Sequence, residues 1–326
     1  SFPTRRSSDL GKKQIEDYGI EPFIAKCKES VWTYLHEWEK MSDQVGYWVD
    51  MEHPYITYEN SYIESEWWSL RQIYDKGLLY QAHKVVPYCP RCGTALSSHE
   101  VAQGYKEVKE LSAIVRFKVK GEEGVSLLAW TTTPWTLPSN LGLCVNPRDT
   151  YARVKVGDEV FIMGKGLIPS VFPDKEVEVL AEMPGSDLRG MEYEPLYRFA
   201  EPDKKAWFVV CDDYVTMEDG TGIVHIAPAF GEDDYRVCRE NDLPFVCLVD
   251  DHGCMTQDTK WPGVFVKDAD HLVLEDLKER GLLFDAPAFT HDYPFCWRCD
   301  TPLLYYARPT WFIRMTAVRD ALVRNN

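Results

Sequence analysis

Two matching cysteine pairs constrain the fold of this chain more than any other feature. The stretch PYCPRCGTAL contains Cys89 and Cys92, and the stretch PFCWRCDTPL contains Cys296 and Cys299. In both, a proline and an aromatic residue precede the first cysteine, an arginine precedes the second, and a threonine and a leucine follow. Two thiolates are half of a tetrahedral site, so we predict that the two stretches, called here the first and second knuckle, share one structural zinc ion.

Other interpretations of these cysteines are four unrelated buried residues or a redox pair. The repeated pattern favours zinc, because neither stretch has a thioredoxin-like context. Cys92 and Cys296 are 204 positions apart (296 − 92), so a shared metal would hold the ends of a long segment side by side. We therefore expect a domain between the knuckles that is inserted into a host domain. The other six cysteines fit small apolar residues in a reducing compartment.

The pattern of apolar residues predicts a helical part and a strand-rich part. Residues 11–40 and 58–77 carry apolar residues at helical spacing, which predicts helices. After the first knuckle, short runs rich in Val, Ile, Phe and Thr alternate with Gly, Pro, Asn and Asp, which predicts a barrel-like domain of about 190 residues. The predicted strands are 113–119, 125–131, 151–156, 159–163, 176–180, 207–211, 222–227 and 245–249, and the predicted helices among them are 232–240 and 268–280.

Composition and the chain ends add further limits. The 326 residues carry a formal net charge of −16, so a nucleic acid could bind only through a local basic surface. No apolar run of about 18 residues occurs, and we expect no membrane span. Residues 1–10, SFPTRRSSDL, read like a translated sequencing adapter and are treated as an artefact. Residues 316–326 form an apparent helix without a cap signal, so we expect a fragment of a longer protein.

The stretch WTTTPWTLPSN is the first candidate for a ligand site. Thr131, Thr132 and Thr133 place three hydroxyl groups at the end of a predicted strand. Pro134 favours an extended Thr133 and cannot continue the strand ladder. Such a strand end can present hydroxyls and free backbone groups to a ligand. A β-branched strand that runs into a proline-rich turn would give the same pattern without a function.

The stretch GTGIVHIAPAFGEDDY is the second candidate. His225 lies on a predicted strand, and Asp233 and Asp234 follow at the start of a predicted helix. A buried histidine with a hydrogen-bond partner, and acids that favour the helix dipole, would explain these residues without a function. Together with the small glycines, a strand histidine and an acid nine residues later instead favour a pocket for a cation with a polar neighbour.

At these residues the chain resembles the isoleucyl members of the class I aminoacyl-tRNA synthetases. The match runs from about residue 43 to the end and includes YIESEWWSLRQIYDKGLLY, VVPYCPRCGTALSSHEVAQGY, TTTPWTLPSN, GTGIVHIAPAFGEDDY and RPTWFIRMTAVRD. Valyl and leucyl members typically carry TTRP where this chain has TTTP. The resemblance implies an α/β protein with a strand-rich, barrel-like editing domain inserted into a Rossmann-type catalytic domain, of which only flanking pieces are present.

The resemblance also implies a division of the chain. Residues 11–100 would be a helical part that flanks the catalytic domain and carries the first knuckle, 101–290 the editing domain, and 291–326 the second knuckle and the return to the catalytic domain. The ATP-site signatures HIGH and KMSKS are absent. Lys40-Met41-Ser42 resembles the start of KMSKS, but it lies before the insert, whereas the family's KMSKS loop lies well after it, so we do not assign it to the ATP site. ATP and Mg²⁺ would therefore be cofactors of the full-length parent only, and this chain alone should give no isoleucine-dependent pyrophosphate exchange.

The resemblance assigns roles to the residues of both candidate stretches. Asp234 would bind the α-ammonium group of a mischarged valyl ester, and His225 would help to set the size limit of the pocket. Thr133 and Asn140 would contact the aminoacyl-adenosine and order water. The residues implied as catalytic are Thr131, Thr132, Thr133, His225 and Asp234, and those implied as substrate-binding are Asn140, Trp135 and Asp233.

The function that the resemblance implies has two parts. The full-length parent would charge tRNA(Ile) with isoleucine, and this part would hydrolyse mischarged valyl-tRNA(Ile). Its partners would be tRNA(Ile), isoleucine and valine, in a cytoplasmic and monomeric protein. The alternatives are a non-catalytic zinc-ribbon module that binds tRNA, a valyl-type editing domain and a free-standing trans-editing hydrolase. The histidine and the acid in the insert argue against the first of these.

Overall fold

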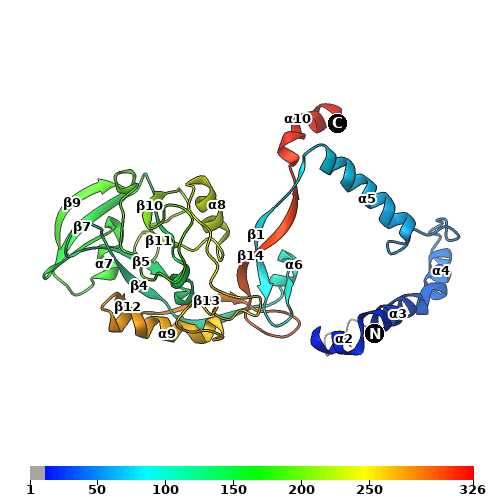
Figure 1. The fold of residues 1–326 in the computed structure, drawn as a ribbon, viewed down its shortest axis with the longest axis horizontal. Helices are drawn as coiled ribbons and strands as arrows, with labels where there is room; N and C mark the ends of the chain where they lie inside the picture. Colours follow the sequence, from blue (N-terminus) through cyan, green and yellow to red (C-terminus); the bar gives the residue numbers. More distant parts are fainter. Residues whose placement is uncertain (1–11) are drawn as a thin grey trace. The chain divides into compact units, whose positions relative to one another are not determined.

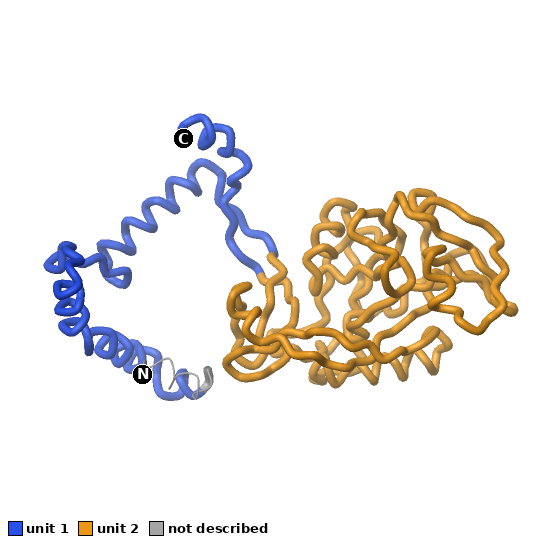
Figure 2. Tube along the Cα trace, turned by 180° about the vertical axis from the view of Figure 1, so that it is seen from behind, with its two compact units in different colours: residues 1–83, 309–326 blue, residues 84–308 orange. Residues whose placement is uncertain are grey.

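The computed structural model describes residues 12–326, so the adapter-like stretch SFPTRRSSDL lies outside the described residues. The chain divides into two compact units (Figure 2). The first contains the residues up to His83 together with Pro309–Asn326, and the second is Lys84–Arg308. Both knuckles and all of the strand-rich segment therefore belong to the second unit.

The first unit is mainly helical (Figure 1). Both helical predictions are confirmed, although 11–40 forms several shorter helices, with Gly19 at a φ of 101° between the first two. No residue of α3, α4 or α5 is buried, so these helices contribute nothing to a core among the described residues. The helices are α2 (Lys12–Tyr18), α3 (Ile20–Val31), η1 (Trp32–Tyr34), α4 (Leu35–Gln44), α5 (Asn60–Asp75), η5 (Met315–Ala317) and α10 (Arg319–Asn325).

Two small sheets flank the knuckles. β1 (Leu79–Cys89) runs into the first knuckle and β14 (Leu304–Ile313) follows the second, and with β2 (Thr94–Ala95) they form a sheet in the order β14-β1-β2. β3 (Tyr105–Leu111) pairs antiparallel with β13 (Ala288–Pro294). This β3–β13 ribbon leaves the first knuckle and returns to the second, so strand pairing alone brings the two knuckles together. None of these strands was predicted from the sequence.

The rest of the second unit is a mixed, nine-stranded sheet that curls into a barrel-like domain (Figure 1). All the predicted strands except 245–249 are confirmed. That segment makes only the isolated bridge Val249↔Met255, because no neighbouring strand continues the ladder. The order is β10-β6-β11-β5-β8-β7-β9, with β4 paired to β5 and β12 paired to β4. The strands are β4 (Ala113–Lys118), β5 (Val125–Thr131), β6 (Gly142–Val145), β7 (Thr150–Val156), β8 (Glu159–Gly164), β9 (Glu178–Pro184), β10 (Phe208–Cys211), β11 (Ile223–Ile226) and β12 (Leu283–Asp285).

Short helices connect these strands. The predicted helix 232–240 is confirmed as α8 (Glu232–Glu240), and the predicted helix 268–280 corresponds to α9 (Val266–Glu279). α9 is fixed by buried apolar residues along its length, including Val273 and Leu277 in the main core. The remaining helical segments are α6 (Ser98–Val101), η2 (Pro134–Ser139), η3 (Lys165–Leu167), α7 (Ile168–Val171) and η4 (Gly185–Leu188).

The sheet places the two candidate stretches next to each other. At its beginning β5 pairs with β8, through Val125, Ser126 and Leu127. Near its end the partner changes, and Trp130 of β5 pairs with Val224 of β11. The threonines that follow β5 therefore lie beside the strand that carries His225.

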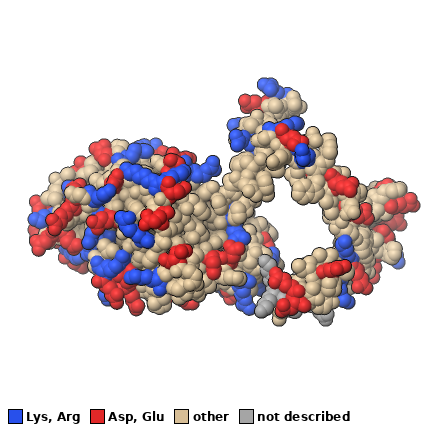
Figure 3. Space-filling model, viewed as in Figure 1, with Lys and Arg blue, Asp and Glu red and all other residues tan. Residues whose placement is uncertain are grey.

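The charged side chains on the surface are mixed in sign. Lysines, arginines and acidic residues are interspersed over the visible face of the strand-rich unit (Figure 3). Among the helices of residues 12–326, none has the length and apolar character needed to cross a membrane.

Candidate functional site

The four knuckle cysteines converge on one point. The Sγ of Cys299 lies 3.5 Å from the Sγ atoms of both Cys89 and Cys92, and the Sγ of Cys92 lies 4.0 Å from that of Cys296. All four sulfurs fall within 4.8 Å of one another. Sulfurs that bind one tetrahedral ion at about 2.3 Å would be about 3.8 Å apart, so the spacing fits a four-sulfur metal site.

The surroundings of the sulfurs also suit a metal ion. Burial raises the pKa of the Cys89 thiol strongly, and it raises the pKa of Cys92 to about 11. Burial acts in the same direction on Cys299, but hydrogen bonds with Thr301 bring its pKa down to about 7. The Cys92 N–H donates to the Sγ of Cys89 over 3.3 Å, as it would to a bound thiolate. A divalent cation would displace the remaining thiol protons, so its affinity would increase with pH.

At the other site, the threonines at the end of β5 and in the turn after it form a hydrogen-bonded chain that reaches His225. The Thr133 N–H donates to Oγ1 of Thr131 over 3.1 Å, and the two hydroxyl oxygens are 3.3 Å apart. The Thr136 hydroxyl donates to the Thr133 carbonyl oxygen at 2.7 Å, and its oxygen lies 2.9 Å from Nε2 of His225. The turn after β5 and strand β11 are thus joined through one hydroxyl group.

These contacts determine which nitrogen of His225 carries the proton. A hydroxyl has a single proton, and that of Thr136 is used by the Thr133 carbonyl. The Thr136 oxygen must therefore accept a hydrogen bond from Nε2–H of His225. Nδ1 is then an acceptor, and it is buried without a hydrogen-bond partner among residues 12–326. Burial lowers the pKa of His225 to about 4, so the imidazole is neutral at pH 7 and this lone pair is not used by any of the described residues.

Asp234 lies in the first turn of α8, the helix that follows β11 in the sequence. Its Oδ2 accepts a hydrogen bond from the Ala227 N–H at 2.9 Å. Burial raises the pKa of Asp234 to about 7, against the effect of this N–H, and the nearby charge of Asp233 raises it further. The effect of burial on this pKa is thus larger than that of one backbone hydrogen bond. A cation beside Asp234 would restore the charged form.

The absence of a side chain at Gly231 leaves room for the Asp234 carboxylate. A Cβ atom at Gly231 would lie 2.8 Å from Cγ of Asp234 and 3.0 Å from each of its oxygens. The backbone of Gly231 is extended, with a φ of −140° that any residue can adopt. The absence of a side chain, rather than an unusual backbone angle, is therefore what this position requires.

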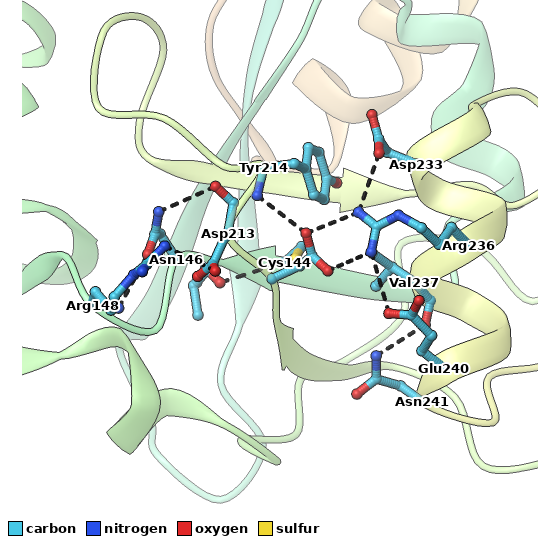
Figure 4. Close-up of polar contacts among 12 residues, drawn as sticks. Cys144, Asn146, Arg148, Asp213, Tyr214, Asp233, Arg236, Val237, Glu240 and Asn241 are labelled. Carbon is cyan, nitrogen blue, oxygen red and sulfur yellow. Dashed lines mark hydrogen bonds and ion pairs between the residues drawn. The ribbon is translucent and has the colours of Figure 1, made fainter.

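Asp233 makes a different set of contacts (Figure 4). Its carboxylate faces Arg236, 3.1 Å away, and its side chain is 57% exposed. Arg236 also makes a two-fold pair with Asp212 at 2.7 and 2.9 Å, and this hydrogen bonding lowers the pKa of Asp212. Arg236 thus ties α8 to the segment after β10, and Asp233 contacts this arginine within the same helix. This geometry does not favour it as the partner of a buried cation, and its substrate contact stays a prediction.

Trp135 lies in η2, Asn140 directly follows η2, and both side chains are buried. The Tyr193 hydroxyl donates to Oδ1 of Asn140 at 2.7 Å, and Nδ2 of Asn140 donates to the Gly142 carbonyl oxygen at 2.9 Å. The Trp135 ring packs edge-to-face on Phe230, with 4.8 Å between centroids. Both side chains shape the fold around the site, and their direct contacts with a substrate stay predictions.

The three remaining residues, Thr132, Thr136 and Asp270, were not equally predictable from the sequence. Thr132 is half-buried beside the hydrogen-bonded threonines. Thr136 was missed, although it belongs to the stretch WTTTPWTLPSN, where a fourth hydroxyl after a proline was the available signal. Asp270, whose Oδ1 accepts the Trp135 N–H at 2.9 Å, had no local signal, because it comes from α9.

Comparison with known proteins defines the class to which this fold and site belong. Residues 5–326 match the family model described as "tRNA synthetases class I (I, L, M and V)". The chain therefore belongs to the class I tRNA synthetases, and the family resemblance of its motifs is confirmed.

Within this family the similar proteins are isoleucine--tRNA ligases. The chain is 59% identical to that of Clostridium acetobutylicum, 56% to that of Clostridium kluyveri and 50% to that of Thermus thermophilus. Each comparison covers 97% of this chain and 30% of the relative. The chain thus spans about a third of the length of these curated relatives.

Two solved structures resemble part of the chain. One is the crystal structure of GlLeuRS-CP1, with a TM-score of 0.46 and 17% identity, covering 55% of this chain and 99% of that chain. The other is the editing domain of the P. knowlesi cytosolic leucyl-tRNA synthetase, with a TM-score of 0.43 and 14% identity, covering 58% and 98%.

Proposed function

We propose that this chain carries the editing site of an isoleucine--tRNA ligase and hydrolyses valyl-tRNA(Ile). The parent enzyme would charge tRNA(Ile) with isoleucine, with ATP and Mg²⁺ bound in a Rossmann-type catalytic domain. The observation that carries the proposal is that a carboxylate held by the Ala227 N–H, that of Asp234, and a buried Nδ1 without a partner, that of His225, both occur around the end of β11. The relatives, which are isoleucine--tRNA ligases, support it.

The need for a second site follows from the size of the substrates. Isoleucine and valine differ by one methylene, which a hydrophobic pocket distinguishes by only about 1–3 kcal/mol, and isoleucyl-tRNA synthetase is itself the standard example of this limit. A second pocket that admits valine and excludes isoleucine removes the errors that remain. Such a pocket needs a partner for the α-ammonium group, a wall that limits the side chain, and groups that position water at the ester.

The described residues can supply these parts. An α-ammonium group beside Asp234 would lower the pKa of the carboxyl group below 7, and the two charges would form a charge-assisted hydrogen bond. His225 would stand beside the amino-acid side chain, and its neutral Nδ1 would accept one hydrogen bond. Thr131, Thr132 and Thr133 would bind the aminoacyl-adenosine and position the attacking water. The ester is activated by its neighbouring ribose hydroxyl, so positioning contributes much of the catalysis.

The rest of the chain would support this site. Residues 101–290 would form the editing domain, flanked by the helical part 11–100 and by 291–326. A structural zinc ion held by Cys89, Cys92, Cys296 and Cys299 would fix the base of the insert. The tRNA(Ile) acceptor end would be the nucleic-acid partner. The ten free cysteines support a reducing cytoplasm, and a monomeric state remains part of the proposal.

The test replaces Asp234 by alanine and measures the hydrolysis of preformed valyl-tRNA(Ile) at subsaturating substrate. Loss of the buried ionic partner is worth roughly 2–5 kcal/mol, so the rate should fall about 30-fold or more. Glu232→Ala is the matched control, because it removes an exposed acid from the same turn of α8. Equal rates for Asp234→Ala and wild type would remove Asp234 from the mechanism. Binding of tRNA without hydrolysis by the wild-type chain would favour the non-catalytic module.

A further inference from the structure

The start of η2 receives its hydrogen-bond acceptor from a distant part of the chain. The first N–H groups of a helical segment have no partner within it. Thr133, at the N-cap position of η2, makes no side-chain cap, and Pro134 has no N–H. The next donor, the Trp135 N–H, donates to Oδ1 of Asp270 over 2.9 Å. Asp270 lies on α9, 135 positions later in the sequence.

The surroundings of Asp270 disfavour the charged form of its carboxyl group. Trp135 is only 3% exposed, and α9 packs directly on η2. Burial raises the pKa of Asp270 to about 7, while Lys267 and the Trp135 N–H act to lower it and Glu110 acts to raise it. A carboxylate in this environment is expensive to keep charged. Among the described residues Asp270 accepts a hydrogen bond from the Trp135 N–H, so fixing this peptide is the role that the geometry gives it.

The peptide that Asp270 holds leads directly into the proposed pocket. Thr136 is the next residue, and its oxygen receives Nε2–H of His225 at 2.9 Å. The Thr136 hydroxyl and N–H both return to the Thr133 carbonyl oxygen, at 2.7 and 3.0 Å. The segment from Thr133 to Thr136 is thus a tight turn, held by β11 on one side and by α9 on the other.

The support behind Asp270 is rigid. α9 buries Val266, Ala269, Val273 and Leu277 against two core clusters. A shift of this helix would open both clusters, so the position of the carboxylate is well determined. Removal of the carboxylate would leave the Trp135 N–H buried without a partner, and the turn would have to move to satisfy it.

We propose that Asp270 is a positioning residue that holds the Thr133–Thr136 turn against His225 and thereby sets the size limit of the editing pocket. The effect on specificity rests on the proposed editing function, whereas the effect on the turn does not. A displacement of the turn by a fraction of an ångström would enlarge the space beside His225. Isoleucyl ester would then be hydrolysed more readily relative to valyl ester.

The experiment compares Asp270→Ala, Asp270→Asn and the control Glu275→Ala, which removes an exposed acid from the same helix. Hydrolysis of preformed valyl-tRNA(Ile) and isoleucyl-tRNA(Ile) is measured with the whole chain. Asp270→Ala should lower the ratio of valyl to isoleucyl hydrolysis roughly tenfold or more, because small displacements of catalytic groups are costly. Asp270→Asn should retain a ratio within about threefold of wild type, because an amide oxygen still accepts the Trp135 N–H. Glu275→Ala should not differ from wild type.

A second measurement is independent of activity. Hydrogen exchange of the peptide segment 131–140 should be faster in Asp270→Ala than in wild type and unchanged in Asp270→Asn. If Asp270→Ala fails to fold, Asp270→Glu takes its place, because it keeps the charge but displaces the carboxylate. An unchanged ratio together with unchanged exchange would overturn the proposal, as would an asparagine variant as impaired as the alanine variant. A wild-type chain without hydrolysis would refute the editing function, and the exchange result would still decide whether Asp270 positions the turn.

Discussion

Replacement of Asp234 by asparagine should make the protein more stable and less active. The carboxyl pKa is raised from 3.8 to about 7 in the folded protein. The folded state therefore binds this proton more tightly than the unfolded state does. The contribution of Asp234 to stability is complete below pH 4 and is lost as the pH rises to about 7. Asparagine keeps an acceptor for the Ala227 N–H, but it never has to carry the buried charge.

The size of the effect follows from the same shift. A difference of about three pKa units corresponds to about 4 kcal/mol at most, since each unit is worth about 1.4 kcal/mol. Because the side chain is partly exposed, we expect a gain of about 2–4 kcal/mol at pH 8.5. The gain at pH 5.5 should be smaller by about 2 kcal/mol, because the wild-type carboxyl group is then largely protonated.

The assay is urea unfolding of wild type and Asp234→Asn at several pH values from 5.5 to 8.5, beside deacylation of valyl-tRNA(Ile). Glu232→Gln, an exposed acid on the same turn, serves as the control and should give a difference that does not change with pH. A variant that is no more stable than wild type at pH 8.5, or whose advantage is the same at every pH, would refute the reasoning. A stabilised variant that still hydrolyses the valyl ester at the wild-type rate would refute the proposed role of the charge.

Two further predictions concern space and metal. Gly231→Ala should lower valyl-tRNA hydrolysis at least tenfold with little loss of helix α8, because its Cβ would displace the Asp234 carboxylate; a wild-type rate at equal folded concentration would show that the carboxylate position is not critical. Purified chain should contain about one zinc ion bound by four sulfurs, and a Cys296→Ser, Cys299→Ser double variant should lose it; unchanged zinc content by elemental analysis and X-ray absorption would exclude the shared site.

The sequence predicted those features that depend on local pattern. The repeat shared by the two knuckles indicated a common site, and the cysteine Sγ atoms do converge. The proline after the threonines indicated the end of a strand, and β5 ends at Thr131. The acids after the glycine at position 231 indicated the start of a helix, and α8 begins at Glu232. In each case residues close in sequence determine the backbone conformation.

The features that were missed depend on partners far away in the chain. β1 and β14, and likewise β3 and β13, exist because each strand pairs with one about 200 positions away. The segment 245–249 has a strand-like composition but lacks such a partner. The raised pKa of Asp234 follows from the atoms packed around it, which the sequence alone does not specify. The contact between Asp270 and Trp135 depends on the docking of α9, so no local pattern could reveal it.

The separation of the two knuckles has a consequence for the order of events on the ribosome. At about 5–20 residues per second, the 204 positions between Cys92 and Cys296 take roughly 10–40 s to synthesise. All nine strands of the large sheet are complete before Cys296 emerges, and β13 follows them directly. The sheet can therefore form first, pairing of β13 with β3 then brings the second cysteine pair to the first, and the proposed zinc ion would bind last. Until then Cys89 and Cys92 would be two free thiols. During this interval the nascent protein would be most susceptible to oxidation or to binding of the wrong metal.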